Sequence, residues 1–295
     1  LSYANASEFD QILRLEAEVG SVQAVQVRSA YTRFSALELF VSNATHADIA
    51  KAASETDFKA VLKPGESFVV RINRIRNYAD QALNTMELEG KLGKQILNST
   101  EGTKVSLKNP DKTFIGIITD EKLVLGLKLT DITSKTFSER RPRKKPFFHP
   151  SAMPSKMARC MVNLAHGKAE SIVLDPFCGT GTSLIEASYI GCRAVGVDAQ
   201  KRMILGTRKN LRYFNISAEG LVLADSRKSP FFKFDCVVTD PPYGRSSSTL
   251  KSTTEQLVKD VLASSLELLG MGQRICIALP IQVNGSGKIS RMAED

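Results

Sequence analysis

The second half of the chain alternates between short apolar runs and longer amphipathic stretches. Apolar runs of about four to eight residues between helical patterns are typical of strands buried in a parallel sheet. Such runs end in Asp175, Asp198, Asp225 and Asp240, and a fifth run covers residues 274–280. The pattern predicts an α/β domain with a mostly parallel, Rossmann-like sheet. Ligand-binding groups of such sheets lie at the carboxyl ends of the strands, where the four acids stand.

The first half has a different pattern. It predicts an amphipathic helix over residues 8–19, strands over 22–27 and 36–41, and a helix over 47–53. These elements indicate a small α+β module over residues 1–60 with a ferredoxin-like topology.

A second group of elements follows Lys63-Pro64-Gly65. Residues 67–75 alternate basic and apolar side chains, as in a half-buried strand, and residues 86–97 form a candidate helix that Gly90 and Gly93 weaken. Further candidate strands lie at 104–107, 113–119 and 123–129.

The region between the two halves is strongly basic. Prolines flank and interrupt five cationic residues, which are Arg140, Arg141, Arg143, Lys144 and Lys145. The composition predicts an extended, cationic linker over residues 133–151 that can follow a phosphate backbone. An ordinary domain linker is the alternative, and the two interpretations are compatible.

Composition narrows the class of protein. Its length of 295 residues favours two domains, and a hydrophobic fraction of 42% is enough to form a buried core. The net charge of +9 fits a polyanionic partner without establishing one. Scattered cysteines (Cys160, Cys178, Cys192, Cys236, Cys276) and histidines (His46, His149, His166) lack metal-ligand spacing. No apolar stretch reaches about 18 residues and no signal peptide opens the chain. We therefore expect a cytoplasmic protein with reduced thiols, no metal and no membrane partner.

The motif Asp240-Pro241-Pro242-Tyr243 carries the most specific chemistry. Two consecutive prolines stiffen the turn after the strand, because each ring fixes φ and neither supplies an N–H. The turn carbonyls and the Asp240 carboxylate become fixed acceptors for one donor group, such as an exocyclic NH2, and Tyr243 offers a flat face for stacking. The alternative is a plain surface turn, since Asp-Pro and Pro-Tyr-Gly form turns readily.

A second motif covers residues 175–182, where a strand runs through a Gly-x-Gly turn into a helix. The glycines let backbone approach a nucleotide-type ligand, but Leu184 replaces the third glycine of a dinucleotide site, which disfavours pyrophosphate. Asp198 is placed to hold ribose hydroxyls, and Asp225-Ser226 suits an adenine amino group. Each acid by itself is more often a cap or turn residue.

These motifs resemble class I S-adenosylmethionine-dependent methyltransferases, and Asp240 to Tyr243 resembles the signature of those that methylate amino groups. Residues 240–247 and the helix region 149–164 are similar to archaeal and eukaryotic tRNA guanine-N2 methyltransferases acting on guanosine 10. The resemblance implies catalytic roles for Asp240, Pro241, Pro242 and Tyr243. It implies cofactor contacts for Asp175, Pro176, Phe177, Cys178, Gly179, Thr180, Gly181, Thr182, Asp198, Ala199, Asp225, Ser226 and His149.

Residues 61–132 resemble the THUMP domain, on the segments 68–71, 88–97 and 105–111. The resemblance implies a unit that grips the 3′ end of tRNA. With the basic linker, the candidate RNA contacts are Arg71, Arg74, Lys104, Lys108, Arg140, Arg141, Arg143, Lys144 and Lys145. Basic residues on exposed strands are also commonly just solvated.

The sequence therefore predicts methyl transfer from S-adenosylmethionine to N2 of a guanine in tRNA, at guanosine 10. The alternatives are another tRNA or rRNA position, a DNA amino-methyltransferase, and a non-catalytic RNA-binding protein. We expect a monomer and leave open an activating partner subunit. The expected methyltransferase domain covers residues 152–295, and residues 283–295 contain no evident C-terminal hairpin.

Overall fold

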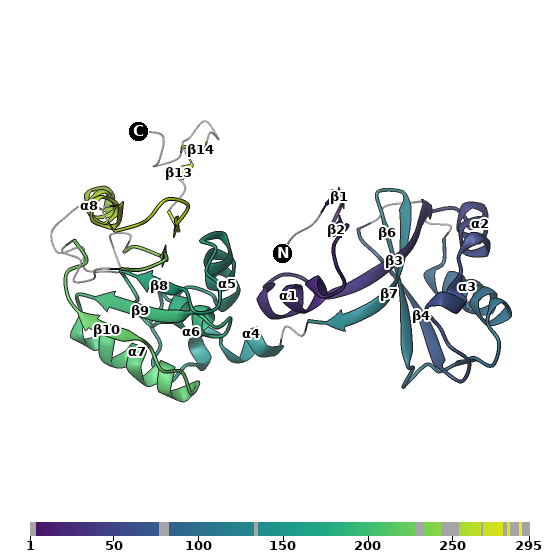
Figure 1. Ribbon diagram of the computed structural model, residues 1–295, viewed down its shortest axis with the longest axis horizontal. Helices are drawn as coiled ribbons and strands as arrows, with labels where there is room; N and C mark the ends of the chain where they lie inside the picture. The colour runs from purple at the N-terminus through teal and green to yellow at the C-terminus, as the bar shows by residue number, and fades with distance from the viewer. Residues whose placement is uncertain are drawn as a thin grey trace. The chain divides into compact units, whose positions relative to one another are not determined.

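The computed structural model describes residues 4–76, 83–132, 135–227, 233–242, 254–266, 268–279, 282–283 and 289–290. The chain divides into two compact units, one of residues 1–27 with 32–133 and one of residues 28–31 with 134–295 (Figure 1). The boundary expected at residue 60 therefore falls inside the first unit.

The first unit is built on a five-stranded sheet in the order β3-β7-β6-β4-β5. Its strands are β3 (Phe34–Asn43), β4 (Ser67–Arg74), β5 (Lys104–Val105), β6 (Lys112–Thr119) and β7 (Lys122–Asp131). Strand β7 pairs antiparallel with both β3 and β6, whereas β4 runs parallel to β5 and β6. Because β3 belongs to this sheet, residues 1–60 do not form a separate ferredoxin-like module.

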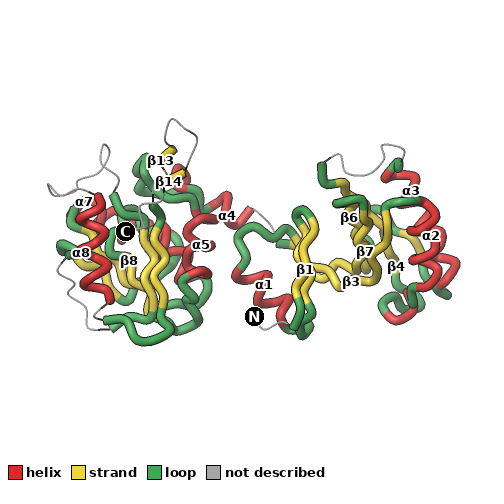
Figure 2. The backbone as a smooth tube through the Cα atoms, turned by 90° about the horizontal axis from the view of Figure 1, so that it is seen from above, coloured by secondary structure: helices red, strands yellow, loops and turns green. Residues whose placement is uncertain are grey.

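Two helices, α2 (His46–Glu55) and α3 (Thr85–Ser99), lie side by side on one face of that sheet (Figures 1 and 2). Each begins at a polar cap: Thr45 accepts from the Asp48 N–H, and Asn84 accepts from the N–H groups of Met86 and Glu87. The helices and sheet enclose one core, in which the Phe114 ring meets Phe58 and Phe68 edge to face. A short 3-10 helix, η1 (Phe58–Ala60), brings Phe58 there.

The prediction for residues 8–27 was wrong in both parts. Instead of a helix, the chain forms a hairpin of β1 (Ala6–Phe9) and β2 (Ile12–Leu15), which turns at Gln11 with a left-handed φ of 61°. Residues 22–27 lie in the helix α1 (Ser21–Arg28), not in a strand. No residue of α1 is buried. Without a core contact to enforce either periodicity, the apolar spacing fits both kinds of element and does not decide between them.

The second unit contains a parallel sheet in the order β10-β9-β8-β11-β12. Its strands are β8 (Ile172–Asp175), β9 (Arg193–Asp198), β10 (Gly220–Leu223), β11 (Cys236–Thr239) and β12 (Arg274–Ile277). These are the five strands predicted from the apolar runs, so the Rossmann-like α/β prediction is confirmed. The order reverses between β8 and β11, and ligands bind such sheets at this switch point.

Helices cover both faces of this sheet, which explains its apolar strands. They are α5 (Ser155–Leu164), α6 (Thr182–Ser188), α7 (Lys201–Tyr213) and α8 (Thr254–Leu266), and Figure 1 shows α7 and α8 on opposite sides. Along β9, Ala194 packs in one apolar cluster while Val195 and Val197 pack in another. A Cβ on Gly196 would lie 2.6 Å from Leu184 Cδ1, so β9 and α6 approach closely because this residue lacks a side chain.

The expectation of an extended linker between the two units was wrong. The basic region is not an extended linker, because it contains the short helices α4 (Lys135–Glu139) and η2 (Pro142–Lys144).

The sequence analysis found no evident hairpin near the end of the sequence. In the structure, β13 (Gln282–Val283) pairs antiparallel with β14 (Ile289–Ser290). Strands of two residues have no recognisable alternation, so the sequence did not indicate this hairpin. Among the described helices, none has the length and apolarity needed to cross a membrane.

Candidate functional site

The buried carboxylate of Asp175 joins three segments at the carboxyl edge of the second sheet. Its Oδ1 accepts from the Phe177 N–H at 3.0 Å and from Thr239 Oγ1 at 2.8 Å. Its Oδ2 accepts from the Ser183 hydroxyl in α6. The end of β8, the start of α6 and the end of β11 are therefore held together through one side chain.

The neighbourhood of Asp175 also contains Asp240, the residue that follows β11. The pKa of Asp175 is raised to about 6, chiefly by burial and also by the charge of Asp240. Hydrogen bonds from Ser183, Thr239 and Phe177 act in the opposite direction and lower it. The two predicted site carboxylates are thus close enough to interact. Asp240 and Pro242 are half-buried and Pro241 is buried, whereas Tyr243 lies outside the described residues.

The glycine turn has the backbone shape that its sequence requires. Gly179 and Gly181 have φ angles of 50° and 77°, in the left-handed region that glycine adopts at little cost. A Cβ on Gly181 would lie only 2.7 Å from Thr207 Cγ2. A Cβ on Gly179 would have no protein atom nearer than 3.8 Å among the described residues, so the turn is open at that point.

Two side chains of α7 hold this turn from behind. Thr207 Oγ1 donates to the Gly179 carbonyl at 2.7 Å, and Asn210 Nδ2 donates to the Thr180 carbonyl at 2.9 Å. Asn210 also exchanges two hydrogen bonds with the backbone of Phe147, at 2.8 and 2.9 Å. The sequence analysis missed both residues. The available signal was their spacing, since two polar residues three apart on the inner face of an amphipathic helix are unusual there.

Asp198 ends β9 and faces the same turn. Its Oδ2 accepts from the Gly179 N–H at 3.0 Å, and its Oδ1 accepts from the Gln200 N–H at 2.8 Å. Burial raises its pKa, while these two bonds oppose that effect. A carboxylate has about four acceptor positions, so Asp198 retains capacity for ligand hydroxyl groups. Ala199, which follows, is exposed.

Asp225 and Ser226 lie just beyond β10. Asp225 binds Arg227, whose Nε lies 3.0 Å from both carboxylate oxygens. The buried Ser226 hydroxyl donates to the carbonyl of Pro176, which anchors the start of the glycine turn. The predicted cofactor residues of β8, β9 and β10 are thereby connected to one another through the turn.

Cys178 is buried within the turn. Burial raises the pKa of its thiol well above the ordinary value, and the charges of Asp175 and Asp198 add to this. The thiol therefore stays protonated and is not a nucleophile. His149 lies outside this network and contacts Ser151, whose Oγ is 2.7 Å from Nδ1.

Two of the predicted RNA contacts, Arg140 and Lys145, are buried, which the expected extended, cationic linker did not anticipate. Arg140 donates to Glu186 at 2.7 and 3.1 Å, and its guanidinium lies over the ring of Phe137 and over that of Tyr189. Lys145 donates to Thr182 Oγ1 at 2.6 Å. Charge patterns in a sequence do not report burial, so these two cations were grouped with their exposed neighbours, which are Arg141, Arg143 and Lys144.

The candidate RNA residues of the first unit also differ from one another. Arg71 donates to the Leu107 carbonyl at 3.2 Å, and Arg74 donates to the Leu83 carbonyl at 2.5 Å. Lys104 and Lys108 are exposed. The two arginines therefore support the local fold, whereas the two lysines present their charge to solvent.

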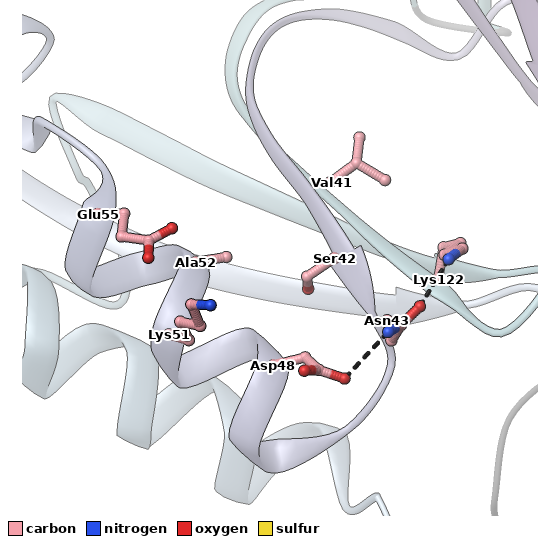
Figure 3. Close-up of a pocket in the computed structure, with 8 residues that line it drawn as sticks. All are labelled: Val41, Ser42, Asn43, Asp48, Lys51, Ala52, Glu55 and Lys122. Atoms are coloured by element: carbon pink, nitrogen blue, oxygen red, sulfur yellow. Dashed lines mark hydrogen bonds between the residues drawn. The ribbon is translucent and has the colours of Figure 1, made fainter.

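A shallow hollow lies elsewhere in the first unit, between α2 and β3 (Figure 3). Asn43 spans it, accepting from Lys122 Nζ at 2.6 Å and donating to Asp48 at 3.1 Å. Its charged side chains have both signs, and none of the predicted site residues lines it. Within the described ranges, no group of three or more His, Cys, Asp or Glu residues is arranged to hold a metal.

Comparisons with known proteins agree with the two units. A family described as "RMKL-like, methyltransferase domain" matches residues 142–284. The THUMP domain family matches residues 43–128, so it begins earlier than the expected residue 61 and includes α2. TrmN from Thermus thermophilus, with a TM-score of 0.50 and 24% identity over 90% of this chain and 77% of that chain, has a similar fold.

Two curated relatives are closer in sequence. The chain is 39% identical to the tRNA (guanine(10)-N2)-dimethyltransferase of Methanothermobacter thermautotrophicus, over 79% of this chain and 68% of the relative. It is 34% identical, with the same coverage, to the protein of that name from Pyrococcus abyssi. The chain therefore belongs to the tRNA (guanine(10)-N2)-methyltransferase family, in which a THUMP domain precedes a class I methyltransferase domain.

Proposed function

We propose that this protein transfers methyl groups from S-adenosylmethionine to the exocyclic N2 of guanosine 10 in tRNA. The observation that carries the proposal is the position of the Asp240-Pro241-Pro242 turn: it follows Thr239, whose Oγ1 donates to Asp175 at 2.8 Å at the switch point of the sheet. This position brings a fixed set of acceptors for an amino group beside a nucleoside-type pocket.

The residues of the pocket fit the cofactor. The turn is open beside Gly179, and Asp198 retains acceptor positions for the two ribose hydroxyls. Asp225, held by Arg227, is the acceptor for the adenine amino group, and Ser226 keeps the turn in place through Pro176. When bound, S-adenosylmethionine supplies an electrophilic methyl group on a sulfonium.

Asp240 prepares the guanine nitrogen for attack. The lone pair of an exocyclic amino group is delocalised into the ring, so the nitrogen is a poor nucleophile. The Asp240 carboxylate and the Pro241 carbonyl accept its two N–H bonds, point the lone pair at the methyl group and stabilise positive charge that develops on nitrogen. Alignment of the reacting atoms at about 3–3.5 Å contributes through proximity.

The base reaches this position by leaving its stack in the tRNA, and Tyr243 with Pro242 then packs on its face. Asp240 is also the nearest acceptor for the proton that the methylated nitrogen releases. Both curated relatives are dimethyltransferases by name, so we expect the once-methylated nitrogen to rebind and react again.

The tRNA is held by exposed cations of both units. We assign phosphate contacts to Lys104 and Lys108 in the THUMP domain and to Arg141, Arg143 and Lys144 near η2, all of which are exposed. The five free cysteines are consistent with a reducing, cytoplasmic environment, and we propose a monomer as the active form.

The test is transfer of labelled methyl groups to an unmodified tRNA transcript, followed by nucleoside analysis. We expect N2-methylguanosine and N2,N2-dimethylguanosine, both lost when guanosine 10 is replaced by adenosine. A parallel reaction contains rRNA and double-stranded DNA. Label at another guanosine would refute the assigned position, and label in DNA alone would favour a DNA amino-methyltransferase.

A further inference from the structure

Buried positive charge is in excess around Glu186 in the second unit. Arg140, Lys145 and Arg159 are only 7%, 5% and 3% exposed, and the one carboxylate among them, Glu186, is 0% exposed. Arg140 Nε lies 2.7 Å from Glu186 Oε1, and Arg159 Nη2 lies 2.9 Å from Glu186 Oε2. Both carboxylate oxygens are thus taken by arginines, and three buried cations share one anion.

Of the three cations, Lys145 is the one that has no carboxylate at contact distance within the described part of the chain. Its one hydrogen-bond partner among the described residues is a neutral group, Thr182 Oγ1 at 2.6 Å, although an ammonium has three donors. Burial lowers the pKa of Lys145 to about 8, and the charge of Arg140 lowers it while Glu186 raises it. A buried cation with so little compensation is costly unless an anion joins it.

The position of Lys145 indicates which anion this is. Thr182 follows Gly181, and its Oγ1 lies 3.4 Å from Thr180 Oγ1, so the ammonium stands beside two hydroxyl groups of the glycine turn. Acidic groups stand elsewhere along the turn: Asp198, at the end of β9, accepts from the Gly179 N–H, and Asp225 follows β10. A ligand that carries both hydroxyl groups and a carboxylate is favoured with the hydroxyls near these acids and the carboxylate near Lys145.

We propose that Lys145, with the hydroxyls of Thr180 and Thr182, binds the carboxylate at the amino-acid end of S-adenosylmethionine. The proposal rests on the proposed function and deepens it, because it assigns a residue near η2 to the cofactor instead of to RNA. The carboxylate restores the charge balance of the cluster, and the neutral hydroxyls supply the remaining hydrogen bonds.

The test measures equilibrium binding by calorimetry and needs no turnover. S-adenosylhomocysteine is compared with its decarboxylated analogue, 5′-deoxy-5′-(3-aminopropylthio)adenosine, which lacks only the carboxylate. We expect the wild-type chain to prefer S-adenosylhomocysteine by about ten- to a hundredfold, the size of a charge-assisted hydrogen bond. Lys145→Met should bring this ratio close to one, and Lys145→Arg should keep most of it.

Lys209→Met is the matched control, because Lys209 is an exposed lysine of α7 that is assigned neither to the cofactor nor to RNA. Its ratio should equal that of the wild type. If Lys145→Met does not fold, the affinity ratio is measured in Lys145→Gln, which keeps a polar side chain but removes the charge. An unchanged ratio in Lys145→Met or Lys145→Gln overturns the proposal.

Two further outcomes have distinct meanings. If the ratio is unchanged but the salt dependence of tRNA binding falls by about one phosphate contact, Lys145 binds RNA and the proposal is overturned. If the wild-type chain binds neither nucleoside, the proposed function fails along with it. If the wild-type chain binds S-adenosylhomocysteine and its decarboxylated analogue equally well, the assignment of Lys145 to the carboxylate is overturned and the proposed function stands.

Discussion

Replacing Glu186 by Gln should destabilise the second unit strongly. The substitution keeps the size of the side chain but removes the carboxylate that contacts both Arg140 and Arg159. A glutamine has one acceptor oxygen and brings an NH2 group that faces a guanidinium, so at least one buried arginine loses its partner. The free energy of unfolding then carries the cost of an uncompensated buried cation.

The burial of the cluster sets the magnitude. Removing one partner of a buried ion pair costs about 3–5 kcal/mol, whereas pairs at the surface contribute little. Glu186 is 0% exposed and both its oxygens are engaged, so we expect the full range. For a domain of about 150–250 residues this lowers the melting temperature by about 6–20 °C.

Scanning calorimetry is the suitable assay, because a protein of two units can melt in more than one transition. Glu219→Gln is the matched control: it breaks another arginine–glutamate pair, with Arg193, in which both side chains are nearly half-exposed. We expect no measurable change from it. If Glu186→Gln lowers stability by less than about 1 kcal/mol, the reasoning from buried charge is refuted.

Three further predictions concern the site. Asp240→Ala should abolish methyl transfer while S-adenosylhomocysteine still binds in calorimetry, and equal loss of both would contradict the role of Asp240 at the target nitrogen. Gly181→Ala should lower the melting temperature and weaken cofactor binding more than Gly179→Ala: both have positive φ, worth about 1–2 kcal/mol, but only Gly181 meets Thr207 at 2.7 Å. The pKa of Asp175 is raised to about 6 in the folded protein, so folding favours its protonated form. The stabilisation from this difference is complete below about pH 4 and is lost as the pH rises through about 6. Between about pH 4 and pH 6, the melting temperature should therefore fall more steeply with rising pH for the wild type than for Asp175→Asn. The same pH dependence in both proteins would show that Asp175 does not titrate in this way.

The sequence predicted the second unit well for a physical reason. Its central strands β8, β9 and β11 are largely buried, so each appears as an apolar run, and four of the five runs end at an acid at the edge of the sheet. The first unit was harder, since the apolar spacing of residues 8–27 fits strands as well as helices and α1 has no buried residue.

The proximity of two proposed site residues was predictable, because a motif combined residue type with place in the fold. Asp175 ends β8 and Asp240 follows the adjacent β11, where Thr239 donates to the Asp175 carboxylate. Thr207 and Asn210 were not predictable, because their roles depend on how α7 packs behind the turn. Lys145 was assigned to RNA because its neighbours in sequence are basic, and only the fold reveals that it is buried.

The double hydrogen bond between Asn210 and Phe147 has a practical consequence for dissecting this protein. A fragment that begins at residue 152, the start of the methyltransferase domain expected from the sequence, would lose Arg140, Lys145 and Phe147. Glu186 would then miss one of its two arginines, and Asn210 would lose its backbone partner beside the glycine turn. Any fragment intended to retain methyltransferase chemistry, or any exchange of RNA-binding units between relatives, should therefore keep residues 135–151 with the methyltransferase unit.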